Sequence, residues 1–224
     1  MNILFIAELG LNIYPYSRFH IERLVAAASE AGADAVKVQL WRTDHFPFME
    51  QREKARYEFP RYEFDWFVRL ARAYGLKPGA SVFDDNAIRL CNTCEASFIK
   101  LAAREQANTA LRYQAQSFGF GPTYRSVTWD MTSIPLRSEH YLATVSKYPT
   151  SPEELEYPLS FAGINLTGLW GWSSHTSGWA DCERAVQLGA KLIEKHLCLD
   201  SEDPEAEWSL GPYDFKTMVD ACTS

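Results

Sequence analysis

Apolar segments of strand length alternate with amphipathic helical segments along most of this chain. Runs rich in Val, Ile, Leu and Phe that end near Gly, Asp or Ser are typical of buried strands in a parallel sheet. Eight segments are expected as strands: Leu4–Leu9, Ala35–Leu40, Lys77–Phe83, Ser97–Ala102, Tyr124–Val127, Tyr141–Ser146, Gly168–Trp172 and Lys191–His196. Alternation of this kind predicts an α/β fold, a (β/α)8 TIM barrel, as a single domain over residues 1–224.

Helical spacing of apolar residues separates most of these strands. The expected helices are Ser17–Glu30, Phe64–Ala73, Asp84–Cys91, Thr109–Gln116, Gly178–Gly189 and Tyr213–Cys222. Between Val127 and Tyr141 there is no helical stripe, so we expect a compact barrel with a reduced fifth βα unit. Trp41–Pro60 is instead a long, charged and aromatic connection, and such connections at this edge of a barrel are often lids or binding loops.

Charged residues recur near the carboxyl ends of several predicted strands, always at alternate positions. Alternate strand residues share a face, so the charged positions follow the apolar residues of the same face. The set consists of Glu8, Lys37, Lys100, Glu194 and His196. Barrel interiors are normally apolar, and buried Lys or Glu is almost never unpaired. The pattern therefore predicts a polar chamber at one end of the barrel. The alternative is that Lys37 with Glu8, and Lys100 with Glu194, are ordinary ion pairs of the core.

Two histidines, His175 and His196, each follow an apolar run, with one helix-length segment between them. The two strands of such a unit are parallel neighbours, so both imidazoles are expected at the same carboxyl edge of the sheet. Two imidazoles can bind a divalent ion and leave positions open for water or substrate. The alternative for either residue alone is a hydrogen-bonded core histidine.

Lysines and serines on the same predicted face supply the groups that bind an anion. Lys37 and Lys100 are fixed cations suited to a phosphate or carboxylate, and three serines could add hydroxyl donors. These serines are Ser81, Ser126 and Ser173. For any one serine taken alone, ordinary turn and strand-end hydrogen bonding is the alternative.

The composition argues against nucleic-acid and membrane partners. A net charge of −7 opposes binding to a phosphate backbone, although local basic residues could still bind a small anion. The first residues lack a basic head and a cleavage site, and no apolar run approaches the roughly 20 residues that span a bilayer. Five cysteines show no disulfide-framework spacing. We therefore expect a cytoplasmic enzyme with reduced thiols.

Five segments, in order, resemble the sialic acid synthase (N-acetylneuraminate synthase) family: Ile6–Gly10, Ala31–Gln39, Lys147–Glu153, Trp172–Thr176 and Ile193–His196. The match runs from about Ile3 to Val219. The resemblance implies a barrel that condenses phosphoenolpyruvate with an N-acylated aminosugar aldehyde, such as N-acetylmannosamine. The products would be a sialic or nonulosonic acid and phosphate, and the cofactor would be a divalent metal, Mn2+ or Mg2+.

The resemblance also implies roles for individual residues. It makes His175 and His196 the metal ligands. Catalytic roles fall on Glu8, Glu194, Lys37 and Lys100. Substrate binding falls on Gln39, Ser81, Glu105, Ser126, Tyr148, Ser173 and Glu205. Within this set, the lysines and serines would hold phosphoenolpyruvate, Glu105 would lie near it, and Tyr148 and Glu205 would contact the sugar.

Several departures from the family pattern leave the activity open. Asn12-Ile13 stands where the family has an Asn-His pair, and Ala103-Arg104 replaces a Ser-Gly pair after Lys100. Arg104 either replaces a phosphate-binding hydroxyl or blocks the pocket. Ser146 replaces a frequent Asn, and no antifreeze-like C-terminal domain follows the barrel before Ser224.

These observations leave three alternative hypotheses for the function. The first is a minimal synthase, and the second is a catalytically impaired barrel that retains metal or anion binding as a binding or assembly subunit. The third is another metal-assisted carbon–carbon lyase on the same scaffold. Aromatic residues in the loop 41–60 could form a lid or a subunit contact, with ordinary packing of a long loop as the alternative. A subunit contact there would agree with the homodimer that we expect.

Overall fold

The computed structural model describes residues 3–46, 48–128, 140–155 and 170–224. Eight parallel strands lie in chain order, and pairing of β1 with β8 closes them into a barrel. The strands are β1 (Leu4–Glu8), β2 (Ala35–Leu40), β3 (Lys77–Val82), β4 (Phe98–Leu101), β5 (Thr123–Val127), β6 (His140–Thr144), β7 (Trp170–Ser174) and β8 (Leu192–Leu197). The predicted TIM barrel is confirmed. A short ninth strand, β9 (Ser209–Leu210), pairs with the end of β8.

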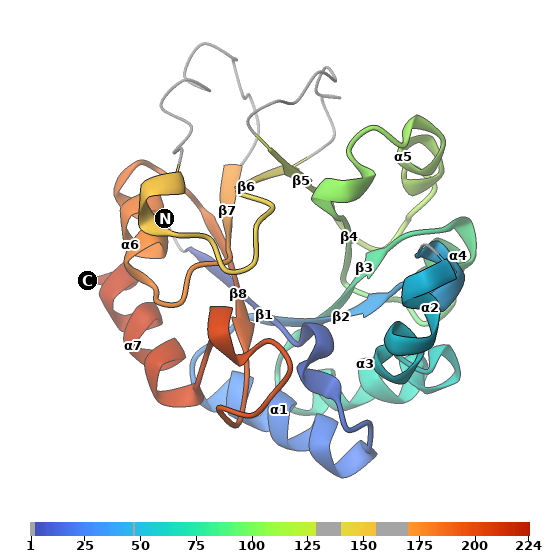
Figure 1. The fold of residues 1–224 in the computed structure, drawn as a ribbon, viewed down its shortest axis with the longest axis horizontal. Coiled ribbons are helices and arrows are strands. Elements are labelled where there is room, and N and C mark those ends of the chain that lie inside the picture. The colour runs from blue at the N-terminus through green and yellow to red at the C-terminus, as the bar shows by residue number, and fades with distance from the viewer. Residues whose placement is uncertain (1–2, 47, 129–139, 156–169) are drawn as a thin grey trace.

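Helices cover the outside of the barrel, as Figure 1 shows. They are α1 (Arg18–Glu30), α2 (Phe48–Lys54), α3 (Phe64–Ala73), α4 (Asp85–Thr93), α5 (Thr109–Ala115), α6 (Ala180–Gln187) and α7 (Pro212–Thr223). Three of them begin at a side-chain cap of the usual kind, in which an oxygen accepts from a backbone N–H of the first turn. The caps are Ser17 for α1, Asp84 for α4 and Asn108 for α5.

Short 3-10 helices lie in the connections between these elements. They are η1 (Gly10–Ile13), η2 (Thr43–His45), η3 (Ala55–Tyr57), η4 (Arg61–Glu63), η5 (Ala103–Glu105), η6 (Pro152–Glu154) and η8 (Ala206–Trp208). Three of them, η1, η5 and η8, follow β1, β4 and β8 and therefore stand at the carboxyl edge of the barrel. No helix in the described ranges is both long enough and apolar enough to cross a membrane.

The barrel interior consists of an apolar layer and a polar layer. Six side chains at the amino ends of the strands form the apolar layer: Ile6, Ala35, Phe98, Tyr124, Leu142 and Leu192. Gly79 makes room for this layer, because a Cβ atom there would overlap the ring of Phe98. Two residues further along most of these strands, the same face carries buried polar side chains. This second layer forms the base of the site.

The predicted elements agree closely with the structure, with two main differences. The strand after residue 169 is Trp170–Ser174 instead of Gly168–Trp172, because backbone pairing with β6 and β8 continues to Ser174. The connection Trp41–Pro60, expected to be a loop, contains α2. The reduced fifth βα unit and Gly168 fall on residues outside the described ranges.

Candidate functional site

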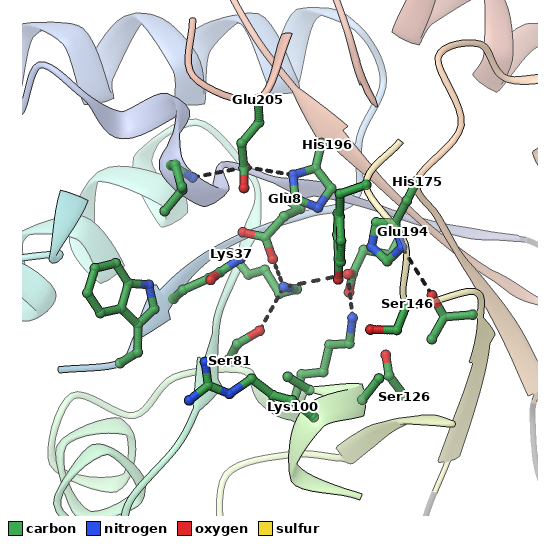
Figure 2. A pocket seen from close by; sticks show the side chains of 18 of the residues that line it. Glu8, Lys37, Ser81, Lys100, Ser126, Ser146, His175, Glu194, His196 and Glu205 are labelled. Atoms are coloured by element: carbon green, nitrogen blue, oxygen red, sulfur yellow. Dashed lines mark hydrogen bonds and ion pairs between the residues drawn. The ribbon is translucent and has the colours of Figure 1, made fainter. Parts of the chain in front are cut away.

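A cavity of about 360 Å³ opens at the carboxyl edge of the barrel. Its base is the polar layer, and its walls come from the connections that follow the strands. Figure 2 shows side chains from the whole circumference pointing toward one another in this cavity. Polar residues that line it include Glu8, Lys37, Gln39, Ser81, Lys100, Ser126, Tyr148, His175, Glu194, His196 and Glu205. Strand parity therefore brings together most of the residues that the sequence singled out.

Glu8 and Lys37, on the adjacent strands β1 and β2, form a buried ion pair. The second carboxylate oxygen of Glu8 accepts from the backbone N–H of Gly10 at 2.6 Å. The Lys37 ammonium donates to Ser81 Oγ at 2.8 Å and lies 3.6 Å from Glu194 Oε1. Burial of the ammonium ion lowers the pKa of Lys37 to about 7, an effect that Glu194 opposes and Lys100 reinforces.

Lys100 and Glu194 form a second buried ion pair. Ser173 joins them, because its hydroxyl lies 3.3 Å from Lys100 Nζ and donates to Glu194 Oε1 at 3.0 Å. Burial alone would raise the pKa of Glu194, but the charges of Lys100 and Lys37 outweigh it and lower that pKa. The two alternatives for these charges are thus compatible, since the ion pairs exist and also line the cavity.

His175 and His196 face each other at the ends of β7 and β8, with ring centroids 5.5 Å apart. His175 Nδ1 lies 2.9 Å from the carbonyl oxygen of Val145, and His196 Nδ1 lies 2.8 Å from Glu205 Oε2. Since these oxygens accept, both Nδ1 atoms are placed to donate, which leaves the Nε2 atoms as the ring nitrogens available to a ligand. Burial, and secondarily His196, lower the pKa of His175 well below its ordinary value, so that ring stays neutral.

This donor set fits a divalent ion. Histidines that ligate metals typically donate their other ring N–H to a carboxylate or a backbone carbonyl, and here both partners are present. Within the described part of the chain, no group of three or more His, Cys, Asp or Glu side chains is placed to hold a metal. An ion here would therefore have His175 and His196 as protein ligands and would leave its other positions to water or substrate.

Glu205 is held tightly against the histidine pair. Besides its contact with His196, Glu205 Oε2 accepts from the backbone N–H of Leu11 at 2.9 Å. Its own N–H donates to the Asn12 side chain at 2.8 Å. Gly10 is required beside it, because its φ is +46° and a Cβ atom would overlap the Glu205 carboxylate. The structure thus places Glu205, predicted as a sugar contact, on His196 at the cavity wall.

An aromatic wall stands beside the histidines. The ring of Tyr148 lies 4.1 Å from that of His175 and 5.7 Å from that of Trp208, measured between centroids. About half of the Tyr148 surface is exposed. Burial of its hydroxyl and the charge of Glu205 nevertheless raise the pKa of Tyr148 to about 12, so the hydroxyl stays protonated. Such a wall is suited to the apolar face of a sugar.

The remaining predicted residues divide into two groups. Gln39 and Ser126 line the cavity, and Ser126 Oγ is buried without a hydrogen-bond partner among the described residues. Ser173 and Glu105 do not line it. Ser173 lies beneath Lys100, and Glu105 faces Asn108 and Arg104. The functional roles assigned to all these residues stay predictions.

Sequence reasoning missed several residues that shape the cavity. Phe83 and Trp208 line its rim, and neither was expected at the site. Trp41 and Phe46 also line the rim and belong to the aromatic connection 41–60 that was expected to form a lid or a subunit contact. Thr144 also lines it and contacts His175 Nδ1 at 3.3 Å. This residue could have been found, because it lies two positions after Leu142 on the inward face of β6.

Comparison with known proteins places the chain among related barrels. The model of the NeuB family matches residues 24–119 and 137–224. A pseudaminic acid synthase of Campylobacter jejuni is 26% identical, over 98% of this chain and 72% of that protein. Human N-acetylneuraminate-9-phosphate synthase is 26% identical, over 96% of this chain and 67% of that protein.

A solved structure supports the same fold. The N-acetylneuraminic acid synthetase of Leptospira borgpetersenii, crystallised with citrate, superimposes with a TM-score of 0.89 over 100% of this chain and 83% of that one, at 20% identity. The chain spans 66% to 72% of the lengths of the first four curated relatives.

Proposed function

The chain belongs to the NeuB family, and on this premise we propose that it condenses phosphoenolpyruvate with an N-acylated aminosugar aldehyde similar to N-acetylmannosamine. The products would be a sialic or other nonulosonic acid and phosphate. The observation that carries this proposal is the buried polar layer, in which two lysines, two glutamates and two histidines converge on one cavity. The family resemblance expected from the sequence motifs is confirmed.

Phosphoenolpyruvate would occupy the β2–β5 side of the cavity base. Lys37 and Lys100 supply positive charge there, and Ser81 contacts Lys37 directly. Ser126 offers a buried hydroxyl that has no partner within the described ranges, as expected of a group that awaits a ligand. Fixed donors in a water-poor site hold an anion without reorganising during the reaction.

The acceptor sugar would lie on the opposite side, against β7, β8 and β1. His175 and His196 would hold Mn2+ or Mg2+, and the bound ion would supply Lewis-acid polarisation of the aldehyde oxygen. Tyr148 and Trp208 form a wall for the sugar, and Trp208 Nε1 is a buried donor without a partner among the described residues. Glu205 would act on the sugar side by keeping His196 oriented.

The proposed reaction forms one carbon–carbon bond and releases phosphate. The methylene carbon of phosphoenolpyruvate attacks the aldehyde carbon, water adds to the carbon that bears the phosphate, and the carbon–oxygen bond to phosphate then breaks. Glu8 would receive a proton from the attacking water, since its carboxylate faces the cavity from the end of β1. That proton would end on the former aldehyde oxygen, and the second proton of the water would leave with phosphate as the keto group forms. Lys37 and Lys100 would hold the departing phosphate by neutralising its charge.

Turnover assays test this proposal. The protein is mixed with Mn2+, phosphoenolpyruvate and a panel of N-acylated aminosugars, and phosphate and 2-keto acid are both measured. We expect the two products in equal amounts. His175→Ala and His196→Ala should each lower kcat/KM by at least about 100-fold, because Lewis-acid polarisation supplies several kcal/mol. His140→Ala is the matched control, since His140 begins β6 at the opposite end of the barrel.

The catalytically impaired barrel is the alternative that these assays separate. Bound metal and phosphoenolpyruvate-dependent thermal stabilisation without turnover on any acceptor would favour a binding or assembly subunit. Unchanged metal content in both histidine variants would reject the ligand pair itself. The cytoplasmic location and the homodimer stay predictions.

A further inference from the structure

The charges that line the cavity are distributed unevenly between its base and its rim. At the base, Lys37 pairs with Glu8 and Lys100 pairs with Glu194. Glu205 adds a third carboxylate beside His196. The lysines of the base therefore share their charge with carboxylates and supply only part of the positive charge that an anion needs. A substrate with a phosphate and a carboxylate brings several negative charges, so further positive charge is needed where it binds.

Two cations at the rim supply this charge. Arg104 and Lys54 both line the cavity, from η5 after β4 and from the end of α2. Lys54 has no ion pair with any acidic side chain of the described residues. Among the acidic side chains of the described residues, Arg104 pairs with its neighbour Glu105 alone, with Nε 3.3 Å from Oε1. Neither cation faces a carboxylate of the cavity base.

The side chain of Arg104 is held in place before any ligand binds. Its guanidinium carbon lies 4.7 Å from the ring centre of Phe46 and 5.2 Å from that of Phe83, so aromatic rings contact the group. Its Nη2 donates to the carbonyl oxygen of His45 at 3.2 Å. Nη1 has no hydrogen-bond partner in the described part of the chain, and an arginine fixed in this way loses little entropy when it binds an anion.

The position of these cations favours one substrate over the other. Arg104 follows β4, which carries Lys100, and its aromatic contacts follow β2 and β3, which carry Lys37 and Ser81. The histidine pair lies on β7 and β8. Arg104 therefore follows the strand of one proposed phosphoenolpyruvate group and contacts residues that follow the strands of two others, and its charge also acts on Tyr148 across the cavity.

We propose that Arg104, assisted by Lys54, forms an anion subsite at the rim that binds the phosphate group of phosphoenolpyruvate. This inference rests on the proposed function for its ligand. Arg104 then donates hydrogen bonds to the phosphate group and does not block the pocket. The guanidinium group of Arg104 offers paired N–H groups in one plane that match the oxygens of a phosphate. Lys54 adds a single charge, and its Nζ lies 5.8 Å from the ring centre of Phe46.

Equilibrium binding tests the inference without any acceptor or turnover. Dissociation constants for phosphoenolpyruvate, inorganic phosphate and pyruvate are measured by calorimetry, because pyruvate keeps the carboxylate and lacks the phosphate. We expect Arg104→Ala to weaken phosphoenolpyruvate and phosphate binding by about tenfold or more, and to leave pyruvate binding unchanged. Lys54→Ala should have a smaller effect in the same direction, and Arg104→Lys should fall between Arg104→Ala and the unsubstituted protein.

Arg89→Ala is the matched control. Arg89 is exposed on α4 and pairs with Asp85, so its removal changes the net charge by the same amount far from the rim. Equal phosphoenolpyruvate affinity of Arg104→Ala and Arg89→Ala would overturn the inference, provided that thermal unfolding shows both variants to be folded. So would an equal loss of pyruvate affinity, or a steady-state effect confined to the KM of the acceptor.

The outcomes also separate this inference from the proposed function. Arg104-dependent binding of phosphoenolpyruvate without turnover on any acceptor would support the rim subsite and contradict the synthase. Turnover with unchanged phosphoenolpyruvate binding in Arg104→Ala would support the synthase and overturn the subsite. An unsubstituted protein that binds neither phosphoenolpyruvate nor phosphate would contradict both.

Discussion

At the scale of single residues, the site depends on ions that are buried as neighbours of opposite charge. Lys37 is almost fully buried, and it contacts Glu8 while Glu194 lies 3.6 Å away. Ions of this kind are retained in barrels at a cost in desolvation, which favourable geometry and added hydrogen bonds must offset. Here Lys37 donates a hydrogen bond to Ser81 Oγ, and the Gly10 backbone N–H donates one to Glu8.

The pKa of Lys37 leads to opposite effects of pH on ligand affinity and on stability. Its pKa is about 7 in the folded protein and 10.5 ordinarily, so between these values the unfolded chain binds the proton and the folded chain does not. The free energy of unfolding should therefore rise with pH in this window, by up to about 1.4 kcal/mol per pH unit. Phosphoenolpyruvate affinity should fall over the same window, because the binding cation is lost.

Calorimetric titration and urea unfolding at several pH values between about 6.5 and 9 check this prediction. This range extends from just below the shifted pKa of Lys37 to about two pH units above it. Lys37→Met should remove both trends. Lys77→Met is the control, since Lys77 is exposed at the start of β3. Affinity that stays constant up to pH 9 would show that Lys37 keeps its proton or does not bind the ligand.

At the scale of elements, the turn after β1 fixes the histidine side of the cavity. Gly10 adopts a left-handed conformation there, and a Cβ atom would overlap the Glu205 carboxylate and lie 3.1 Å from His196 Nδ1. Gly75 has a similar backbone, with φ of +77°, but a Cβ atom there would meet nothing within 4 Å. Substitution at Gly75 therefore introduces backbone strain alone, whereas substitution at Gly10 introduces backbone strain and a steric conflict.

Substitution of these glycines should show that difference. Gly75→Ala should lose about 1–2 kcal/mol of stability because alanine is disfavoured in the left-handed region. Gly10→Ala should lose more, because its Cβ atom would also overlap the Glu205 carboxylate. Only Gly10→Ala should also weaken Mn2+ binding, by about tenfold or more, because Glu205 would no longer orient His196. Urea unfolding and metal titration measure both effects. Equal Mn2+ affinity in the two variants would contradict the proposed role of this turn.

The elements also show which parts of the site a sequence can predict. Helices α1 and α3 and strand β2 lie within one residue of their expected bounds, because periodicity and caps determine them locally. Helix α2 was not expected, since its short segment carries no sustained apolar stripe. The positions of Phe46 and Trp208 at the rim could not be predicted for a related reason, because connections follow tertiary contacts and not a period.

At the scale of the whole molecule, the barrel separates stability from chemistry along its axis. The apolar layer around Phe98 and Leu142 fills the amino end, and the polar layer begins two residues further along the strands. Parity alone predicted this division, because an inward charge at a strand's carboxyl end requires partners or solvent. The pairs of Lys37 with Glu8 and of Lys100 with Glu194 were expected as ion pairs of the core, and both form. The orientation of Glu205 toward His196 could not be predicted, since Glu205 lies in a connection that follows tertiary contacts.

The closed barrel also sets the two halves of the cavity opposite each other. Strands β2 to β5 carry the two lysines with Ser81 and Ser126, whereas His175 follows β7 and His196 lies on β8. Strand β1 joins the two halves through Glu8. This arrangement suits two substrates that must meet, one an anion and one an aldehyde. The central claim is therefore that this single cavity joins them by attack of an enol carbon, followed by release of phosphate.

The fate of one oxygen atom tests this claim most directly. Phosphoenolpyruvate is prepared with heavy oxygen at the position that bridges carbon and phosphorus, and the released phosphate is analysed by mass spectrometry. We predict that phosphate carries the label, and that it appears only when both the aminosugar acceptor and Mn2+ or Mg2+ are present. Unlabelled phosphate, or release that does not need the acceptor, would contradict the account.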